Sequence, residues 1–483
     1  MQKSETYFLG AILFCGLAMA CSGLVLSYSY WWDELYSVVG ARLSMASMMS
    51  DFIMEDVHPP FYQFALKLWI TAFGDGERTT RALSTLFSLM TVLAFWVLGR
   101  RHFHKATTLT ALTVMVSCSL FSYFAQETRS YSLLLLLTTC STFLYLDSCR
   151  EPTHRIKPVL LAVSLLLLSL THYFGLIYSG TIILLLLVDA RRDLRAGIGF
   201  ILLGGICLVW PAIHYLYGDI GSRTGQNFWI ETNGIATTVA TVSDGLTPQL
   251  NVISEALVGA GLKDVLTAVV FTALLLLVIL FSTKQRQTEA RQSVYGRKLS
   301  LVLVTYIALI AFIDLHSPIS THRNFIVLLP AFSILITLAA QALNQALFNL
   351  ATPALILFMI SNLAVSALLL RNKTTPIENH RAAAQYIEAN LSPGDVFYYL
   401  DRSDKLQKVH KLMALYYFEE KPEPNPIKQQ HIAALSHNAF VLLQHHSYDV
   451  EALAAELINN GQQVTVFNPH QKSATSVSVI EIR

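Results

Sequence analysis

The feature that most constrains this chain is a series of apolar runs, separated by short polar clusters, that recurs up to about residue 371. An apolar run of about 20 residues is long enough to cross a bilayer as a helix. Only 14% of the residues are charged and 53% are hydrophobic, which is too apolar for a soluble chain. The sequence therefore predicts an all-α polytopic membrane domain of about eleven spans over residues 1–371. The runs lie near 7–28, 80–99, 106–125, 130–147, 158–170, 176–188, 197–217, 264–282, 299–315, 324–342 and 351–370.

The basic residues indicate how these spans are oriented. Lys and Arg gather in alternate loops, at 100–105, 150–157, 191–195 and 284–298. Cytoplasmic loops are enriched in such residues, so the pattern places the N-terminus in the cytoplasm and the loop 29–79 on the outer face. The segment 59–73 is apolar but only about 15 residues long, and we expect a helix along the outer membrane surface.

After residue 371 the composition becomes polar, and the segment 372–483 has no run that could span a membrane. Its pattern alternates helices, near 378–391, 405–418 and 449–460, with strands near 396–400, 440–443 and 463–467. Such alternation predicts a small soluble α/β domain. With eleven crossings from a cytoplasmic start, this domain lies on the extracytoplasmic side.

Acidic groups lie in the first outer loop. Asp33 and Glu34 follow the first span directly, and Asp56 and His58 precede the pair Pro59-Pro60. An adjacent carboxylate pair outside a membrane can be a solvated helix cap, and the prolines can simply begin a helix. The helix start explains the prolines well but His58 poorly. Asp33 and Glu34 would point about 100° apart on a helix, so we expect one to act and the other to position.

Cationic and polar groups lie in the outer loops as well. Arg81, Arg129 and Arg323 fall at outer ends of spans. A single arginine there can snorkel to the lipid headgroups, but several together suit a phosphate, which guanidinium groups bind through paired hydrogen bonds. Glu127, His172 and Tyr173 are candidates for the pocket wall. Glu127 can instead pair with Arg129, and His172 and Tyr173 can be a satisfied interfacial pair.

Four patches together resemble the GT-C-fold glycosyltransferases, in the branch of protein O-mannosyltransferases and bacterial lipid A aminoarabinose transferases. Their order and spacing match over roughly the first third of the chain. The stretches around 172–175 and 323–330 agree more loosely. The patches are Asp33-Glu34, Asp56-Val57-His58-Pro59-Pro60, the stretch 74–84 around Glu77 and Arg81, and Gln126-Glu127-Thr128-Arg129-Ser130-Tyr131.

The resemblance implies a polyprenyl-phosphate-sugar donor and transfer of one sugar to a lipid, glycan or protein acceptor at the outer face of a bacterial-type inner membrane. Asp33 matches the base of the family, Glu34 its partner, and Arg81 the arginine of the second span. Asp56 and His58 match the motif near the acceptor. A carboxylate that takes the acceptor proton contributes about 10² to 10⁴ in rate. One such carboxylate suffices for a single displacement, so we expect inversion.

The resemblance also bears on cofactors and partners. We expect no required cofactor, because the lipid-linked sugar phosphate is the donor substrate. A divalent metal is possible at an acidic loop, but Asp33 and Glu34 have no evident ligand set at the right spacing, and this branch is usually described without a catalytic metal. The net charge of +2 gives no reason to expect nucleic acid as a partner.

Two other classes of protein remain open at this stage. A transporter or flippase for a lipid-linked sugar would line a central pathway with charges, whereas here the charges cluster at one face. Two broken helices in corresponding halves would favour transport. The second alternative is a non-catalytic lipid-sugar binding protein, in which the acidic loop only holds an acceptor.

Overall fold

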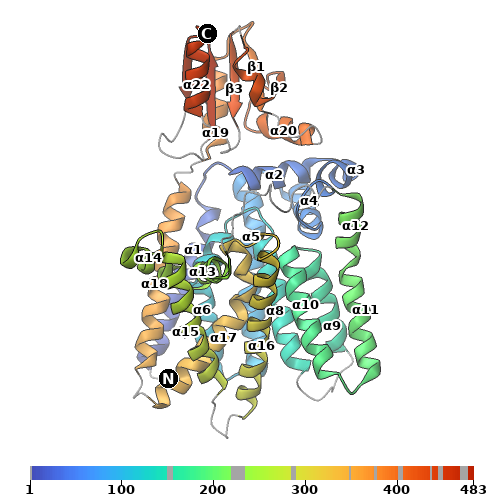
Figure 1. The fold of residues 1–483 in the computed structure, drawn as a ribbon, viewed down its shortest axis with the longest axis vertical. Helices are drawn as coiled ribbons and strands as arrows, with labels where there is room; N and C mark the ends of the chain where they lie inside the picture. The colour runs from blue at the N-terminus through green and yellow to red at the C-terminus, as the bar shows by residue number, and fades with distance from the viewer. Residues whose placement is uncertain are drawn as a thin grey trace. The chain divides into compact units, whose positions relative to one another are not determined.

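The structure is a computed structural model that groups the chain into two compact units (Figure 1). The first unit comprises residues 1–25, 57–62 and 81–370, and the second comprises residues 26–56, 63–80 and 371–483. Parts of two basic clusters, at 149–155 and 284–289, and the outer-loop residues 219–233 lie outside the described residues. The structure describes residues 3–148, 156–218, 234–283, 290–346, 350–374, 378–400, 406–435, 438–443, 450–467 and 477–483.

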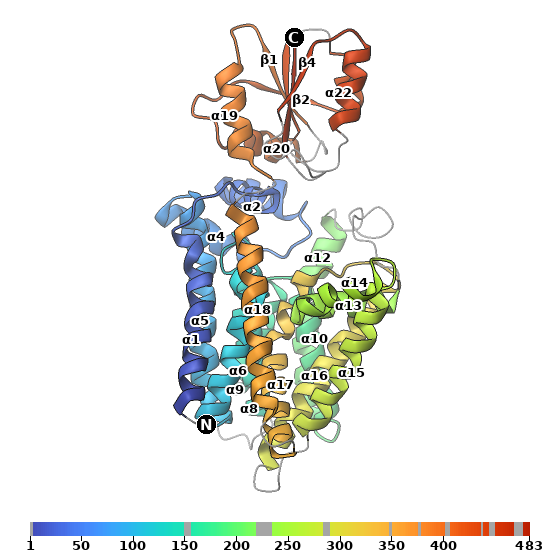
Figure 2. The same ribbon diagram turned by 90° about the vertical axis from the view of Figure 1, so that its left-hand side faces the viewer.

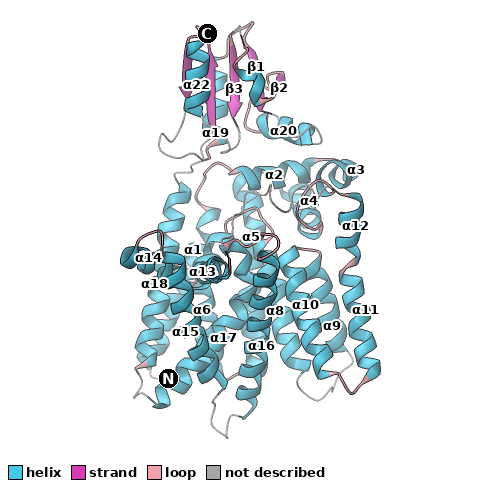
Figure 3. Ribbon diagram, viewed as in Figure 1, coloured by secondary structure: helices cyan, strands magenta, loops and turns pink. Residues whose placement is uncertain are grey.

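The first unit is helical throughout its described residues (Figure 3). Among the residues that the structure describes, seven helices are long and apolar enough to cross a membrane. Large apolar side chains on them, such as Leu93, Leu276 and Phe312, are mostly exposed, as expected for faces that contact lipid. The prediction of a multi-pass membrane protein agrees with this, while the number of eleven spans stays a prediction. The helices are α1 (Lys3–Cys21), η1 (Ser22–Leu24), α5 (Glu77–His102), α6 (Lys105–Ser117), α7 (Ser119–Phe124), α8 (Tyr131–Ser148), α9 (Ile156–Ser169), α10 (Tyr173–Asp189), α11 (Leu194–Cys207), α12 (Val209–Tyr217), α13 (Ile235–Leu246), α14 (Pro248–Val258), α15 (Lys263–Thr283), α16 (Ala290–Asp314), η5 (His322–Leu328), α17 (Leu329–Ala346) and α18 (Ala351–Thr374).

The run expected as one span over 106–125 is broken into two helices. Cys118 adopts an extended conformation, with φ −66° and ψ 139°, and it ends α6 and begins α7. An α-helix cannot continue through a residue with this ψ value. The short helix α7 follows this break and leads to the turn 125–130, which contains the predicted residues Glu127 and Arg129.

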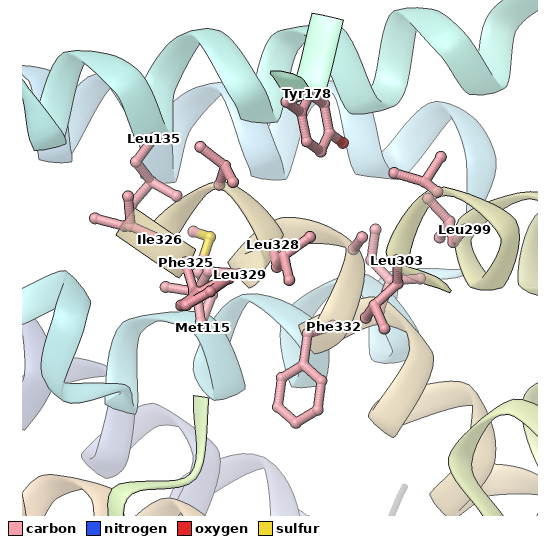
Figure 4. Packing of buried hydrophobic residues seen from close by; sticks show 14 of the residues in the cluster. Met115, Leu135, Tyr178, Leu299, Leu303, Phe325, Ile326, Leu328, Leu329 and Phe332 are labelled. Atoms are coloured by element: carbon pink, nitrogen blue, oxygen red, sulfur yellow. The ribbon is translucent and has the colours of Figure 1, made fainter. Parts of the chain in front are cut away.

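The core of the first unit fixes the segment that begins with His322 and Arg323. The 3₁₀ helix η5 begins with polar residues, and its later, apolar residues are fully buried among several spans. Figure 4 shows these side chains pointing between α6, α8, α10 and α16. Because protein cores are close-packed, the buried end of η5 holds its first two residues in place. The labelled side chains are Met115, Leu135, Tyr178, Leu299, Leu303, Phe325, Ile326, Leu328, Leu329 and Phe332.

In the second unit, two helices from the segment that follows the first apolar run pack together. The helix expected over 59–73 is α4 (Phe61–Phe73), and it is too short to span a bilayer. Its Lys67 donates hydrogen bonds to the carbonyl oxygens of Ala41 and Leu43 at the end of α2 (Trp32–Arg42). A lysine that satisfies the last carbonyls of a helix is stabilising, which explains a charge in this apolar segment. The neighbouring elements are α3 (Met45–Ser47) and the π-helix η2 (Met48–Ile53).

The C-terminal part of this unit is a five-stranded sheet in the order β2-β1-β3-β5-β4. β1, β2 and β3 are parallel, and β5 runs antiparallel to β3 and β4. α19 and α20 cover one face of the sheet and α21 and α22 the other, and Figure 2 shows α19 and α22 on opposite sides. The elements are α19 (His380–Asn390), β1 (Val396–Leu400), α20 (Gln407–Ala414), β2 (Pro424–Ile427), α21 (Gln429–Ile432), β3 (Ala439–Leu443), α22 (Val450–Asn459), β4 (Val464–Phe467) and β5 (Ser478–Ile482).

The predicted small α/β region at the C-terminus is confirmed, with three strands and three helices close to the expected positions. The sequence pattern missed β2 and β5. β2 contains Pro424 and Pro426, which argue against a strand in general, but it lies at the edge of the sheet, where proline is tolerated.

Candidate active site

The predicted acidic pair lies in the first turn of α2, and burial separates its two members. Asp33 is partly exposed, whereas Glu34 is buried with 1% of its surface exposed. Carboxylates near a helix N-terminus are stabilised by the helix dipole. Asp33 is therefore the more accessible of the two carboxylates. The expectation that one carboxylate acts and the other supports it stays a prediction.

The segment that leads into α2 is held by Tyr417 and Arg381, which the sequence analysis did not select, together with Glu77 from one of the four patches. The backbone N–H of Tyr30 donates to the Tyr417 hydroxyl at 2.8 Å, and this hydroxyl donates to Glu77 Oε1 at 2.5 Å. Glu77 also forms a salt bridge with Arg381. Burial raises the pKa of Tyr417, and the Glu77 carboxylate raises it further, so the phenol stays protonated.

Glu378 is a second carboxyl group at the beginning of α2. Its Oε2 accepts a hydrogen bond of 2.6 Å from the backbone N–H of Trp32. Burial raises the pKa of Glu378 to about 7; the Trp32 hydrogen bond opposes this in part, and the charge of Asp33 adds a smaller increase. No motif in the sequence pointed to Glu378.

Asp56 belongs to the second unit and lies in the turn after η2. It is partly buried, and its backbone N–H donates to the Ile53 carbonyl at 3.3 Å. The next residues of the motif, including His58, belong to the first unit.

In the first unit, the turn 125–130 is fixed by its neighbours. The Gln126 side chain donates to the Met19 carbonyl at the end of α1 and accepts from the Ser22 hydroxyl. From α5, the Ser84 hydroxyl donates to the Glu127 carbonyl at 2.5 Å. Because a buried backbone must be hydrogen-bonded, these side chains define the conformation of the turn and the position of Arg129.

Predicted residues from four separate segments form one group, which we call the cationic cluster: His58, Arg129, Tyr131, His172 and Arg323. Arg129 donates to His58 Nε2 at 3.3 Å, since a guanidinium has only donors. The rings of His58 and His172 are 4.9 Å apart, and those of Tyr131 and His172 are 5.7 Å apart. The Arg323 guanidinium lies 5.9 Å from the centre of the Tyr131 ring. The structure thus brings Arg129 and Arg323 together with both histidines.

His172 supplies a buried donor to this cluster. It caps α10, and its Nδ1 accepts the backbone N–H of Phe174 at 3.2 Å. Burial holds its pKa well below the usual value, and the nearby His58, Arg129 and Arg323 lower it further. The ring is therefore neutral with its proton on Nε2. This Nε2 has no hydrogen-bond partner among the described residues.

Three predicted residues have surroundings that favour a structural role. Arg81 is fully buried at the start of α5, and Glu127 is 1% exposed. Buried charges persist in proteins when they are paired, and both residues interact with other described residues. The Tyr173 hydroxyl is 2.6 Å from His214 Nδ1 on α12, and the two rings are stacked. Tyr173 is thus engaged with α12.

Asp244 is a further acidic group near the cationic cluster that the sequence analysis did not select. Its Oδ2 lies 3.8 Å from His322 Nδ1, one residue before Arg323. A Cβ on Gly245 would lie 2.8 Å from the His322 carbonyl oxygen, so only glycine allows this close approach. An Asp-Gly pair is common in polar segments, so the sequence alone gave no reason to select Asp244.

No group of three or more His, Cys, Asp or Glu side chains suitable for a metal ion occurs among the residues that the structure describes. The expectation that no metal is required stays a prediction.

The fold defines the chain as a polytopic helical membrane protein with a small C-terminal α/β region, and known structures share this architecture. ArnT from Cupriavidus metallidurans in the apo state matches with a TM-score of 0.61 at 12% identity, over 99% of this chain and 98% of that chain. The same protein bound to undecaprenyl phosphate matches with a TM-score of 0.59 at 12% identity, over 99% and 97%. The apo oligosaccharyltransferase of Archaeoglobus fulgidus matches with a TM-score of 0.51 at 12% identity, over 94% and 71%.

At the level of sequence, the family model of dolichyl-phosphate-mannose-protein mannosyltransferases matches residues 57–217. No curated protein sequence matches the chain. The family match and the shared fold confirm the resemblance predicted from the four patches. The matched range contains His58, Arg81, Glu127, Arg129, His172 and Tyr173, while Asp33, Glu34, Asp56 and Arg323 lie outside it.

Proposed function

We propose that this protein is a membrane glycosyltransferase that moves one sugar from a polyprenyl-phosphate carrier to a lipid, glycan or protein acceptor at the extracytoplasmic face. The observation that carries the proposal is the cationic cluster. It joins two guanidinium groups and a buried imidazole N–H donor from four segments of one unit. Such a set suits a phosphate, since charged donors bind phosphate oxygens through strong hydrogen bonds.

The similarity to ArnT bound to undecaprenyl phosphate supports a lipid phosphate as the ligand. Within the cluster, Arg129 and Arg323 would neutralise the phosphate charge, and His172 Nε2 would donate a hydrogen bond. We keep Arg81 as a candidate for the same role. Its complete burial makes it the weakest of the three arginines, because a fully enclosed guanidinium reaches a ligand only after rearrangement.

The chemistry assigned to Asp33 follows from its accessibility. The acceptor hydroxyl is a poor nucleophile, and Asp33 would take its proton as the oxygen attacks the anomeric carbon of the sugar. The bond from this carbon to the phosphate oxygen breaks, and polyprenyl phosphate leaves with the bonding electrons. The arginines stabilise this anion, so no general acid is required. One displacement inverts the anomeric configuration. Glu34 supports Asp33 from the interior.

Asp56 and His58 remain the first candidates for contacts with the acceptor. Glu127 and Tyr173 are the weaker candidates. For His58 the cluster offers a second role, since it accepts a hydrogen bond from Arg129 and thereby orients that guanidinium. The basic loops place the N-terminus in the cytoplasm and the C-terminal region outside, in a bacterial-type inner membrane.

The proposal is tested with the variant Asp33→Asn. Permeabilised membrane vesicles that contain the protein are supplied with undecaprenyl phosphate carrying a radiolabelled hexose or pentose. The measured quantity is label transferred from this lipid to any other lipid, glycan or protein. We expect a loss of 10²-fold or more for Asp33→Asn, on the order of a general-base contribution.

Asp51→Asn is a matched control, because Asp51 is a carboxylate of the same unit that pairs with Lys408 at 2.9 Å. This control should transfer label at the wild-type rate. Full residual transfer in Asp33→Asn would remove Asp33 as the base. A transporter would instead move the lipid without separating the sugar from its carrier, and the wild type would then release no label from the donor.

A further inference from the structure

The backbone on both sides of Trp31 is held by side chains that come from more than 340 residues later in the chain. Trp31 is extended, with φ −86° and ψ 171°, and it offers no side-chain cap to α2. The N–H groups of Tyr30 and Trp32 instead donate to Tyr417 and Glu378. The first N–H groups of a helix have no partner within the helix, so external groups decide where the helix begins.

Tyr417 does more than accept one hydrogen bond. Its hydroxyl accepts from Tyr30 and donates to Glu77, so both of its hydrogen-bonding directions are used. Arg381 pairs with Glu77, and its guanidinium lies 5.7 Å from the centre of the Tyr417 ring. Its backbone N–H also donates to the Ser29 hydroxyl at 3.3 Å. These groups form a network, and a satisfied buried network is rigid.

A glutamate is an unusual residue to cap the N-terminus of α2. Asn, Ser or Gln could accept the Trp32 N–H without a charge, whereas a buried carboxyl beside Asp33 is costly to ionise. Burial raises its pKa to about 7, with the charge of Asp33 as a second cause. Residues that reduce stability are often retained at sites where they serve function.

We propose that Glu378 and Tyr417 are positioning residues for Asp33. They hold the backbone immediately before Asp33 and thereby set the direction of its carboxylate toward the acceptor hydroxyl. The inference rests on the proposed role of Asp33 as the base. It gives the C-terminal region a defined role, namely the assembly of the catalytic loop, and neither residue needs to touch the donor or the acceptor.

The variants are Glu378→Gln, Glu378→Ala and Tyr417→Phe, and the chain offers matched controls. Glu388 on α19 accepts the backbone N–H of Glu419 at 2.6 Å, so Glu388→Gln alters the same kind of contact elsewhere. Tyr386 donates its hydroxyl to Glu481 at 2.6 Å, so Tyr386→Phe matches Tyr417→Phe. All variants are made in the full chain and compared for folding by thermal unfolding in detergent.

We expect Tyr417→Phe and Glu378→Ala to reduce the transfer rate at saturating donor about 10- to 100-fold, because small displacements of a catalytic group are costly. Binding of undecaprenyl phosphate should change less than twofold, since neither residue belongs to the cationic cluster. Both controls should keep the wild-type rate. Wild-type rates in Glu378→Ala and Tyr417→Phe, or an equal loss in the controls, would overturn the inference.

The pH profile separates positioning from a general loss of structure. Glu378 is faced by Asp33 and the Trp32 backbone of α2. His380 and Arg381 follow it at the start of α19, and the His410 ring of α20 packs on Trp32. Ionised Glu378 binds the Trp32 N–H in a charge-assisted hydrogen bond, and the amide of Glu378→Gln gives a neutral one.

The ratio of the wild-type rate to the Glu378→Gln rate should therefore rise about fivefold between pH 6 and pH 8. A ratio that does not change with pH would refute the role of the Glu378 charge, even if Glu378→Ala fails to fold. The Asp33→Asn variant is measured in parallel. If Asp33→Asn transfers label at the wild-type rate, Asp33 is not the base and the positioning role falls with it, whereas a loss in Asp33→Asn with full rates in the other variants rejects only the positioning role. A wild type that releases no label from the donor rejects the proposed function itself.

Discussion

Arg129→Gln tests the donor side of the proposed site. The substitution removes the guanidinium that donates to His58 Nε2 and that contributes its charge to the surroundings of His172. Glutamine keeps a polar side chain of similar reach without the charge. A hydrogen bond to a charged group contributes about 1.5 to 3 kcal/mol, and each 1.4 kcal/mol corresponds to about a factor of ten in affinity. We therefore expect undecaprenyl phosphate to bind about 10- to 100-fold more weakly.

The assay is equilibrium binding of undecaprenyl phosphate to the protein in lipid nanodiscs, at low and at high salt. The variant should also show a weaker dependence on salt, because one charge that attracts the phosphate is lost. Arg192→Gln is the control, since Arg192 is an exposed residue of a predicted cytoplasmic loop. Wild-type affinity in Arg129→Gln, or equal weakening in Arg192→Gln, would refute the assignment of the cationic cluster to phosphate.

Two further predictions concern stability. Burial raises the pKa of Glu378 from its ordinary value of 4.5 to about 7 in the folded protein, so folding favours its protonated form. Its ionisation therefore destabilises the fold as pH rises from about 4.5 to 7, and Glu378→Gln should unfold at a higher temperature than the wild type at pH 8 but not at pH 5. Equal shifts at both pH values would contradict this. A Cβ at Gly175 would lie 2.4 Å from the Leu168 carbonyl oxygen, so Gly175→Ala should cost about 1 to 3 kcal/mol in the free energy of unfolding. Gly180→Ala on the same helix, where the space is open, should cost nothing, and equal melting temperatures for the two variants would show that the close approach is unimportant.

The elements that follow from local pattern were predicted well. Long apolar runs produce helices because a bilayer leaves the backbone no other way to satisfy its hydrogen bonds. The exception is Cys118, which breaks a continuous apolar run through its extended backbone, and neither proline nor glycine marks the break. In the C-terminal region the alternation revealed β1, β3 and β4, but the proline-containing β2 could be recognised only from its edge position.

Some of the candidate site residues could likewise be selected from the local sequence, and others only from the structure. Asp33, His58, Arg129, His172 and Arg323 were selected because charged groups in short motifs stand out in an apolar chain. Glu378 and Tyr417 stand in a polar region where glutamate and tyrosine are ordinary residues. Nothing local distinguishes them from Glu388 and Tyr386, which form the same kinds of contact away from α2.

The sequence by itself determined that the chain is a helical membrane protein with a C-terminal α/β region. It also supplied the arginines and carboxylates that we propose for phosphate binding and proton transfer. These properties depend on composition and on periodicity over neighbouring residues. Only the tertiary structure decided which side chains meet. It separated partly exposed Asp33 from buried Glu34, enclosed Arg81, joined Arg129 to His58, and brought Glu378 to a helix end 346 residues away. Such contacts depend on how distant segments pack, and a linear pattern carries no record of that packing.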